Sequence, residues 1–215
     1  MVNNKPSNNK INNKIESDTT QHYYSSKQNS IFKLKKISAF LLGSKFEFFT
    51  APGVFSKNKI DNGTYILIEN AQVKEKSKLL DLGCGYGAVG IVFAKVKKCD
   101  VVMADSNERA VELAKMNAHL NGVKCDVRVT NIFQGIPEKF DTILLNPPQS
   151  AGKEVCFKMI EAAKEHLNKK GTLQIVARPK KGGKTLAQKM IKVFGNAYEI
   201  AKGAGYKVYL SVMDN

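Results

Sequence analysis

The stretch Leu79-Leu80-Asp81-Leu82-Gly83-Cys84-Gly85-Tyr86-Gly87-Ala88-Val89-Gly90-Ile91 sets the interpretation of the whole chain. An apolar run with a carboxylate, three glycines at alternate positions and a second apolar run predict a buried strand, a tight turn and a helix. Glycine suits such a turn because the backbone takes positive φ values there and a ligand can approach with no Cβ in the way. The stretch therefore predicts a ligand cradle, although its G-x-G-x-x-G spacing also fits a dinucleotide-binding turn.

Strand and helix patterns alternate along the rest of the chain. Strands are expected at 79–83, 100–104, 125–129, 140–145 and 171–177, with a strand pair near 197–212, and helices at 87–97, 107–121, 153–168 and 183–194. Because strands that alternate with helices form parallel crossover units, the expected fold is α/β, an open, doubly wound, seven-stranded and mostly parallel sheet. Gly203-Ala204-Gly205 between two apolar runs predicts a hairpin, and hence an antiparallel C-terminal strand.

The N-terminal part of the chain differs in composition. Residues 1–21 interleave asparagine with lysine and contain too few apolar groups to offset ordering entropy, so a disordered tail is expected there. Residues 22–215 are expected to form a single domain, with an N-terminal extension at 22–70 and a catalytic sheet at 79–212. Within the extension, alternating patterns between Ile31 and Thr50 predict a small strand pair, and residues 61–70 predict a helix.

The chain is strongly basic. Its 34 Lys and Arg residues against 19 Asp and Glu residues give a net charge of +15, and residues 151–215 alone carry 13 basic and 5 acidic side chains. Basic side chains gain affinity for polyanions by releasing counterions that are condensed on phosphates, so a polyanionic partner is expected. The alternative is a lysine-rich surface that is only solvated.

Composition also disfavours several classes of protein. No run approaches 18 apolar residues and no short apolar stretch follows a basic start, so neither a membrane span nor a secretory signal is expected. The four cysteines, at positions 84, 99, 125 and 156, lack C-x-x-C spacing. They are expected to be core residues in a reducing compartment, the cytoplasm, and no metal site is expected.

Polar residues follow the first three strands of the predicted sheet, at the edge where ligands bind in such folds. Asp105 could accept hydrogen bonds from both hydroxyls of a ribose, and its alternative role is an N-cap for the next helix. Asp81 could hold an ammonium group or accept hydrogen bonds from the glycine backbone. Asn131 and Ile132 could meet the edge and the face of an adenine, although an asparagine in a loop is also a common turn former.

Asn146-Pro147-Pro148-Gln149 follows the fourth strand and suggests a reaction. Two prolines fix φ and remove two N–H donors, so the carbonyl groups of this corner form a rigid acceptor platform. The exocyclic amine of a base is a poor nucleophile because its lone pair is delocalised into the ring. If the Asn146 amide oxygen and a nearby carbonyl each accept one N–H, the amine is oriented and its developing charge is stabilised. A plain Asn-Pro-Pro loop is the alternative.

Together these residues resemble the class I S-adenosylmethionine-dependent methyltransferases, in particular the branch that methylates amines. Pro52-Gly53-Val54-Phe55-Ser56, Asp61-Asn62-Gly63-Thr64 and Gly205-Tyr206-Lys207-Val208-Tyr209 are similar to the ribosomal small subunit methyltransferase C family of guanine-N2 enzymes. The likeness extends from about His22 to Val212. It implies a Rossmann-like methyltransferase fold and S-adenosylmethionine as the cofactor.

The resemblance also implies roles for individual residues. The cofactor would be bound by Asp81, Gly83, Gly85 and Gly87 at its methionine part, by Asp105 with Ser106 at its ribose and by Asn131 and Ile132 at its adenine, with Thr64 near the donor group. The target amine would be held by Asn146, Pro147, Pro148 and Gln149.

Two departures from the family pattern affect these roles. The family often has an acidic residue where Asn131 stands, which should weaken adenine recognition. Adenine-N6 enzymes commonly have an aromatic residue where Gln149 stands, and a glutamine cannot stack on a base in its place. Gln149 therefore argues against adenine as the target and leaves stacking to Phe55 or Phe49.

A cluster of cations follows the fifth strand and is expected to project from the same edge as the cofactor site. Its members, called the basic turn below, are Arg178, Lys180, Lys181 and Lys184. Cations around glycines suit a phosphate clamp for RNA, and an exposed helix entry is the alternative. Bacterial members of the family carry two related domains and this chain has room for one, so substrate contacts are expected from the sheet rim, the N-terminal segment and basic loops.

The expected function is therefore methylation of an exocyclic amine in RNA, with guanine N2 of ribosomal RNA as the first choice. The alternatives are a tRNA guanine-N2 methyltransferase, a protein-glutamine methyltransferase and a non-catalytic RNA-binding module. A dehydrogenase is disfavoured because no proton donor stands beside a hydride site. The three histidines fall in the tail or on predicted helices.

Overall fold

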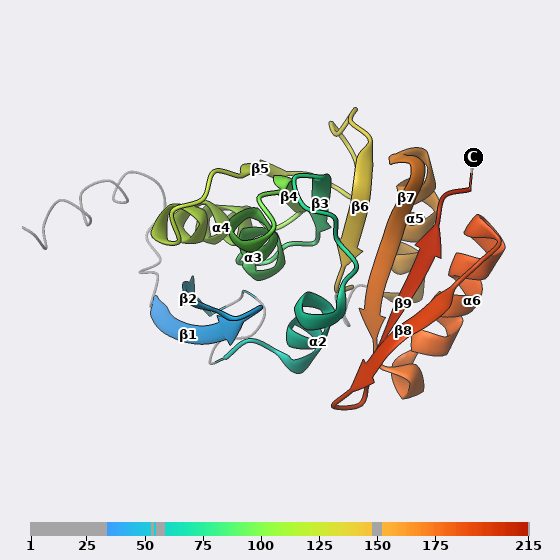
Figure 1. The fold of residues 1–215 in the computed structure, drawn as a ribbon, viewed down its shortest axis with the longest axis horizontal. Helices are drawn as coiled ribbons and strands as arrows, with labels where there is room; N and C mark the ends of the chain where they lie inside the picture. The colour runs from blue at the N-terminus through green and yellow to red at the C-terminus, as the bar shows by residue number, and fades with distance from the viewer. Residues whose placement is uncertain (1–33, 53, 55–58, 148–151, 215) are drawn as a thin grey trace, which may run out of the picture. The chain divides into compact units, whose positions relative to one another are not determined.

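A seven-stranded sheet forms the centre of the structure. The computed structural model describes residues 34–52, 54, 59–147 and 152–214. The strands of the sheet are β3 (Lys78–Leu82), β4 (Asp100–Asp105), β5 (Asp126–Val129), β6 (Phe140–Leu145), β7 (Leu167–Ala177), β8 (Tyr198–Gly203) and β9 (Tyr206–Val212). They lie in the order β5-β4-β3-β6-β7-β9-β8, and β9 runs antiparallel to both of its neighbours (Figure 1). The predicted α/β sheet with an antiparallel C-terminal strand is confirmed.

Helices cover both faces of this sheet. The helices are α2 (Asn62–Asn70), α3 (Ala88–Val96), α4 (Glu108–Leu120), α5 (Gly152–Glu165) and α6 (Gly183–Phe194), with a 3-10 turn, η1 (Pro179–Lys181). Leu79 of β3 belongs to the core that contains α2, α3 and α4, whereas its neighbour Leu80 belongs to the core that contains α5 and α6. Successive strand residues point to opposite faces, so both faces of β3 are apolar and the sequence reads as a continuous apolar run.

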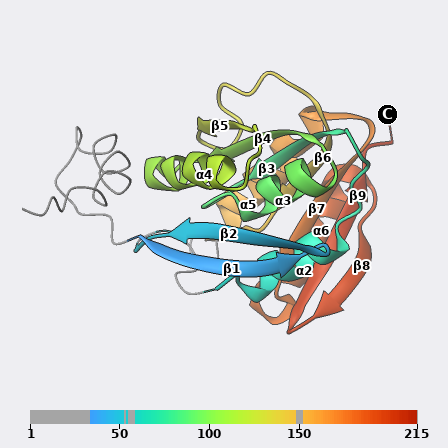
Figure 2. The same ribbon diagram turned by 60° about the vertical axis from the view of Figure 1, so that its left-hand side comes forward.

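A separate two-stranded sheet precedes the main fold. Its strands, β1 (Lys35–Leu41) and β2 (Ser44–Thr50), pair antiparallel across a turn at Leu42 and Gly43. Phe46 and Phe48 on β2 are buried in the core that also holds α2, α3 and α4, so the hairpin packs on that side of the domain (Figure 2). The strand pair and the helix that were predicted in the N-terminal extension are both present.

Two asparagines at the end of α4, Asn117 and the C-cap Asn121, bind the free edge of β2. Asn117 accepts a hydrogen bond from the Phe49 N–H at 2.6 Å and donates one to the Phe49 carbonyl at 3.0 Å. Asn121 likewise accepts a hydrogen bond from the Glu47 N–H at 3.3 Å and donates one to the Glu47 carbonyl at 2.7 Å. Asn117 also donates to the carbonyl of Tyr86 in the glycine turn at 2.9 Å, so one amide joins the hairpin to that turn.

The end of α5 and the start of β7 differ from the prediction. α5 ends at Glu165 instead of 168, and β7 begins at Leu167 instead of 171. Leu167 is buried and pairs with Phe140, and Asn168 donates a hydrogen bond to Asp141 at 2.8 Å. These tertiary contacts hold an extended chain where the local sequence favours a helix.

Several predictions concern residues outside the described ranges. They are the tail at 1–21, the start of the domain near His22, the turn residues Gly53, Phe55 and Ser56, and Pro148 and Gln149. Within the ranges given above, no helix is long and apolar enough to cross a bilayer. The four cysteines are unpaired thiols, and Cys84, Cys99 and Cys156 are buried.

Candidate active site

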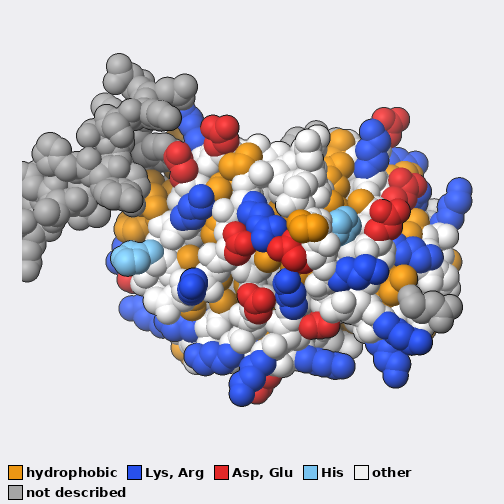
Figure 3. Space-filling view, turned by 90° about the horizontal axis from the view of Figure 1, so that it is seen from above, with side chains coloured by type: hydrophobic (Ala, Val, Ile, Leu, Met, Phe, Trp, Pro, Cys, Tyr) orange, Lys and Arg blue, Asp and Glu red, His pale blue; other side chains and the backbone are white. Residues whose placement is uncertain are grey.

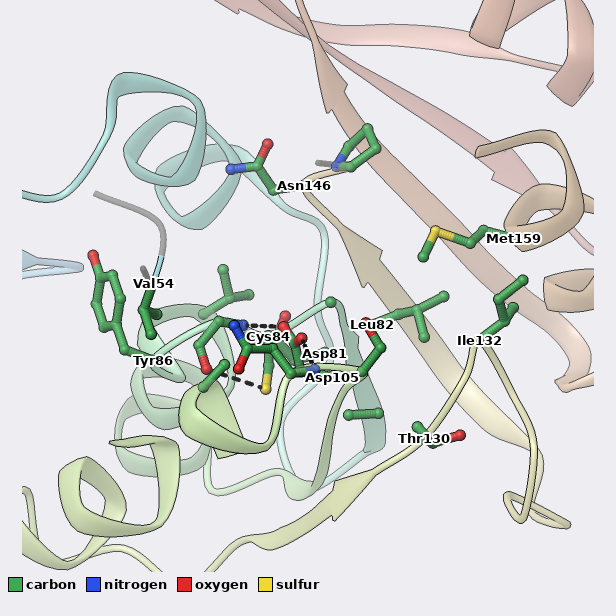
Figure 4. Close-up of a pocket in the computed structure, with 18 of the residues that line it drawn as sticks. Val54, Asp81, Leu82, Cys84, Tyr86, Asp105, Thr130, Ile132, Asn146 and Met159 are labelled. Carbon is green, nitrogen blue, oxygen red and sulfur yellow. Dashed lines mark hydrogen bonds between the residues drawn. The ribbon is translucent and has the colours of Figure 1, made fainter. Parts of the chain in front are cut away.

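A cavity of about 590 Å³ lies beyond the carboxyl ends of β3, β4 and β6 (Figure 4). Most of the predicted site residues line it, although they come from segments far apart in the sequence. Those residues are Thr64, Asp81, Gly83, Gly85, Asp105, Ser106, Asn131, Ile132, Asn146 and Pro147. The structure therefore brings most of the predicted cofactor residues together with the predicted target residues Asn146 and Pro147 in one cavity.

The glycine turn forms one wall of this cavity. Gly83, Gly85 and Gly87 have φ values of 71°, 56° and 88°, a region that side chains with a Cβ rarely occupy. Gly83 and Gly85 line the cavity. A Cβ added to Gly85 would meet no atom within 4 Å, so the backbone there stays open to a ligand.

Gly87 does not line the cavity, contrary to its predicted role in ligand contact. It is the N-cap of α3, and a Cβ at this position would lie 3.1 Å from Ala114, Ile91 and Met103 side-chain atoms. Glycine is needed here for the left-handed backbone and for the close packing of α3 behind the turn.

Asp81 is held by the backbone of α3. Its side chain is only 3% exposed, and Oδ2 accepts a hydrogen bond from the Gly90 N–H at 2.9 Å. Burial raises the pKa of Asp81 to about 7, the Gly90 hydrogen bond opposes this rise, and the charge of Asp105 adds to it. Of the two roles considered for Asp81, the structure contains the hydrogen bond to backbone, and the carboxylate also lines the cavity.

Asp105 supports the turn from the end of β4. One carboxylate oxygen accepts from the Gly85 N–H at 2.8 Å and the other from the Asn107 N–H at 2.9 Å. The N-cap of α4 is Asn107, whose side chain accepts from Arg109, so Asp105 is not the helix cap. Each carboxylate oxygen has a second lone pair, which leaves Asp105 able to accept hydrogen bonds from a ligand.

Ile132 lies across the cavity from the glycine turn, and Asn131 also lines the cavity (Figure 4). Asn131 is exposed, and Ile132 is partly buried with a positive φ of 57°. A β-branched residue is strained in that conformation, so the surrounding loop must hold it there. The result is an apolar side chain on the cavity wall beside Thr130 and Met159 (Figure 4).

Asn146 stands at the end of β6, opposite the glycine turn (Figure 4). Its amide nitrogen donates to Thr64 Oγ1 at 2.9 Å and lies 3.5 Å from Asp61 Oδ1. Asp61 is the N-cap of α2, and the same oxygen accepts from the Thr64 N–H at 3.0 Å. The contact between Asp61 and Asn146 was not predicted. The available signal was Asp61-Asn62-Gly63-Thr64, which is typical of a capped helix start.

A second, smaller cavity of about 180 Å³ shares Asn146 and Pro147 with the first. Arg178, Lys181 and Tyr206 also line it, and the Arg178 guanidinium lies 4.6 Å from the centre of the Tyr206 ring. Lys180 and Lys184, the other members of the basic turn, are exposed. Phe49, which was predicted as a stacking candidate, lines neither cavity, and Phe55 lies outside the described residues.

The described part of the chain contains no group of three or more His, Cys, Asp or Glu side chains that could hold a metal ion. The polar atoms of the large cavity are instead carboxylates, amides and a hydroxyl next to backbone N–H groups. Such a set suits an organic ligand with hydroxyl and amino groups.

Comparison with known proteins agrees with this geometry. The family model for the methyltransferase small domain matches residues 45–210. The protein YbxB of Bacillus subtilis, described as uncharacterized, is 36% identical over 195 residues, which are 88% of this chain and 96% of YbxB. The ribosomal RNA small subunit methyltransferase C of Cronobacter sakazakii is 34% identical over 169 residues, which are 76% of this chain and 48% of that enzyme.

A solved structure extends the comparison. The T. thermophilus 16S rRNA N2 methyltransferase RsmC, in complex with AdoMet and guanosine, superposes with a TM-score of 0.77 at 26% identity, over 83% of this chain and 50% of that one. The chain thus spans about half the length of the small subunit methyltransferases that it matches. From the extent of the family match and the identity to YbxB, we conclude that the chain belongs to the methyltransferase small domain family.

Proposed function

We propose that the chain transfers a methyl group from S-adenosylmethionine to the exocyclic amine of a base in RNA, with guanine N2 of ribosomal RNA as the target. The observation that carries the proposal is the position of Asn146, which faces the glycine turn across the large cavity with its amide nitrogen bound to Thr64. The names of the relatives support the substrate class, because they describe ribosomal RNA methyltransferases. A ribosomal RNA target would place the reaction in the cytoplasm.

The large cavity fits S-adenosylmethionine. Its volume of about 590 Å³ lies within the range of roughly 300–1,000 Å³ that is usual for small-molecule sites. Gly85 leaves room for close approach to the backbone, Asp105 offers carboxylate lone pairs for a ribose, and Ile132 offers an apolar surface for a base. S-adenosylmethionine supplies a methyl group on a positively charged sulfur.

Asn146 would act on the other reactant. Its amide oxygen and a backbone carbonyl of the Pro147 corner would each accept one N–H of the target amine, which turns the nitrogen lone pair toward the large cavity. As the amine attacks it becomes positively charged, and both acceptors then bind it more strongly than before. An interaction that strengthens toward the transition state raises the rate, and one such contact is worth about 2.7–4 kcal/mol in well-studied sites. The excess proton would leave to water after the transfer.

The second cavity is the natural place for the target nucleotide, because it meets the large cavity at Asn146 and Pro147. The guanidinium of Arg178, backed by the Tyr206 ring at 4.6 Å, would offer the base a planar surface. Lys181 lines the same cavity and would contact a phosphate. Arg178 would thus stack on the base, whereas its position in the sequence predicted a contact with a phosphate.

The overall charge supports an RNA partner less directly than the position of the basic turn. On the face seen from above in the view of Figure 1, lysines and arginines are interspersed with carboxylates (Figure 3). On this face, the positive charge is therefore not gathered into one patch. The basic turn, by contrast, follows the carboxyl end of β7 and reaches the second cavity through Lys181.

The test compares wild-type protein with Asn146→Ala on ribosomal RNA from a strain that lacks the gene. Nucleoside mass spectrometry should find N2-methylguanosine with the wild type, and the variant should be slower by about 10²–10³-fold. S-adenosylmethionine binding, measured by calorimetry, should change less than about threefold. Asn131→Ala is the matched control, since it should weaken cofactor binding and leave the saturated rate nearly unchanged.

Comparable turnover by Asn146→Ala would reject the acceptor role of this corner. Methyl transfer to tRNA or to a protein glutamine instead of ribosomal RNA would replace the substrate and keep the mechanism. Binding of RNA with no transfer to any of these acceptors would support the non-catalytic alternative.

A further inference from the structure

The start of α2 holds the amide of Asn146 in one orientation. The amide nitrogen donates to Thr64 Oγ1 at 2.9 Å and faces Asp61 Oδ1 at 3.5 Å. Asp61 and Thr64 are themselves joined, since the same Asp61 oxygen accepts from the Thr64 N–H at 3.0 Å. Both residues lie more than 80 positions before Asn146, and the fold brings them together at the end of β6.

Only one of these two partners can distinguish the ends of an amide. A hydroxyl such as that of Thr64 can donate or accept, so it could pair with either end of the Asn146 side chain. An ionised carboxylate can only accept, so Asp61 favours the amide nitrogen on its side and repels the amide oxygen. The 3.5 Å distance is long for a hydrogen bond, and the preference is therefore mainly electrostatic.

The orientation of the Asn146 amide decides whether this corner can accept a hydrogen bond from the target amine. With the nitrogen toward Asp61, the oxygen of Asn146 points away from α2 and is free to accept an N–H from a target amine. With the amide reversed, its NH₂ group would face the N–H groups of that amine, and two donors cannot bond to each other. A reversed amide would thus remove the acceptor that the proposed transfer needs.

Helix capping does not explain why this residue is an aspartate. Capping uses Oδ1, and an asparagine or a serine caps a helix about as well. The other oxygen, Oδ2, is buried and finds no hydrogen-bond partner among the described residues. A buried acceptor without a partner lowers stability, so the carboxylate is an unfavourable choice on stability alone.

We infer that Asp61 is a positioning residue for methyl transfer, and that its carboxylate orients the Asn146 amide so that the amide oxygen faces the target amine. Thr64 completes the arrangement by accepting from the same nitrogen. The inference rests on the proposed function and adds a residue that does not touch either reactant.

The first test is Asp61→Asn. The substitution keeps the size of the side chain and the capping oxygen, and removes the negative charge by which Asp61 favours the amide nitrogen of Asn146. We expect kcat to fall at least tenfold, KM for S-adenosylmethionine and for RNA to change less than threefold, and the melting temperature to stay within a few degrees. Asp100→Asn, at an exposed position where β4 begins, removes the same charge and should leave kcat unchanged.

The second test exchanges the two side chains. Asn146→Asp alone puts two carboxylates side by side and should be nearly inactive. Adding Asp61→Asn to it restores one amide and one carboxylate in contact, with the carboxylate now on the target side, where it needs no orientation. We expect the double variant to turn over at least tenfold faster than Asn146→Asp. A purely structural role for Asp61 predicts that the two losses multiply.

The third measurement does not depend on activity. In ¹⁵N-labelled protein, Asp61→Asn should shift the two side-chain NH₂ signals of Asn146 and speed their exchange with solvent, while most backbone signals stay in place. Unchanged signals, an unchanged kcat in Asp61→Asn, or a double variant no faster than Asn146→Asp would each overturn the inference. Absence of transfer by the wild type would instead reject the proposed function, and the NH₂ signals would then decide the orientation alone.

Discussion

Replacing Asp81 by asparagine tests the electrostatics of the glycine turn. Asp81 is 3% exposed and its pKa is raised from an ordinary 3.8 to about 7, chiefly by burial. The folded protein therefore retains a proton that the unfolded chain has already released. The contribution to stability is fullest below about pH 4 and is lost as the pH rises through about 7, where the buried carboxylate ionises. Asparagine keeps an acceptor for the Gly90 N–H and cannot ionise.

The size of the effect follows from the pKa difference. At about 1.4 kcal/mol for each pH unit, the difference between 3.8 and about 7 corresponds to a total loss of roughly 4 kcal/mol in the free energy of unfolding. Between pH 5.5 and pH 8, about half of that loss, roughly 2 kcal/mol, should occur. Wild type and Asp81→Asn should therefore differ in pH dependence by this amount, with the variant gaining relative stability at the higher pH.

Urea unfolding followed by circular dichroism at several pH values between 5.5 and 8 measures this difference. Ionisable groups that do not interact with Asp81 contribute equally to both proteins, so their effects cancel in the comparison. Equal m-values for the two proteins would show that both unfold with the same change in exposed surface. Stability curves that run parallel across this pH range would refute the assignment of a raised pKa to Asp81.

Three further changes test other parts of the structure. Gly90→Ala would put a Cβ 2.6 Å from Met103 Cγ, so the free energy of unfolding should fall by about 1–3 kcal/mol, and an unchanged melting temperature would mean that the core relaxes freely. Tyr86→Phe removes a buried hydroxyl that has no hydrogen-bond partner among the described residues, so stability should stay the same or rise by up to about 1 kcal/mol in urea unfolding, whereas a clear loss would reveal a bonded hydroxyl. Replacing the three lysines of the basic turn by glutamine should weaken RNA binding and lower the salt-dependence slope by about 0.7 for each phosphate that the protein no longer neutralises, and an unchanged slope in filter binding would take the turn out of the interface.

Much of the fold could be predicted because its signals are local. Apolar runs that end at the glycine turn, at Asp105 and at Asn146 identify strands whose carboxyl ends meet at one edge, and the structure confirms that edge. The boundary between α5 and β7 could not be predicted, because Leu167 becomes part of a strand only through its pairing with Phe140.

Most residues of the candidate site could be predicted from the sequence, whereas several of their contacts could not. Gly87 was identified by its spacing, yet the structure gives it a packing role, because spacing cannot tell which side of a turn faces a ligand. Asp61 was missed as a partner of Asn146 since the two are 85 residues apart, and a capping aspartate looks the same whether or not a distant amide lies beside it.

The pair Asn117 and Asn121, at the end of α4, has a consequence for insertions. Asn117 and Asn121 are about one helical turn apart, a distance of about 6 Å along the axis. Alternate residues of a strand are about 6.7 Å apart, so the two asparagines can bind every second residue of β2. Sliding the hairpin by one residue would turn Phe46 outward, bring Glu47 inward and release four hydrogen bonds together. The hairpin therefore has a single register on the domain, and a one-residue insertion between Glu47 and Phe49 would break the match between β2 and the two asparagines.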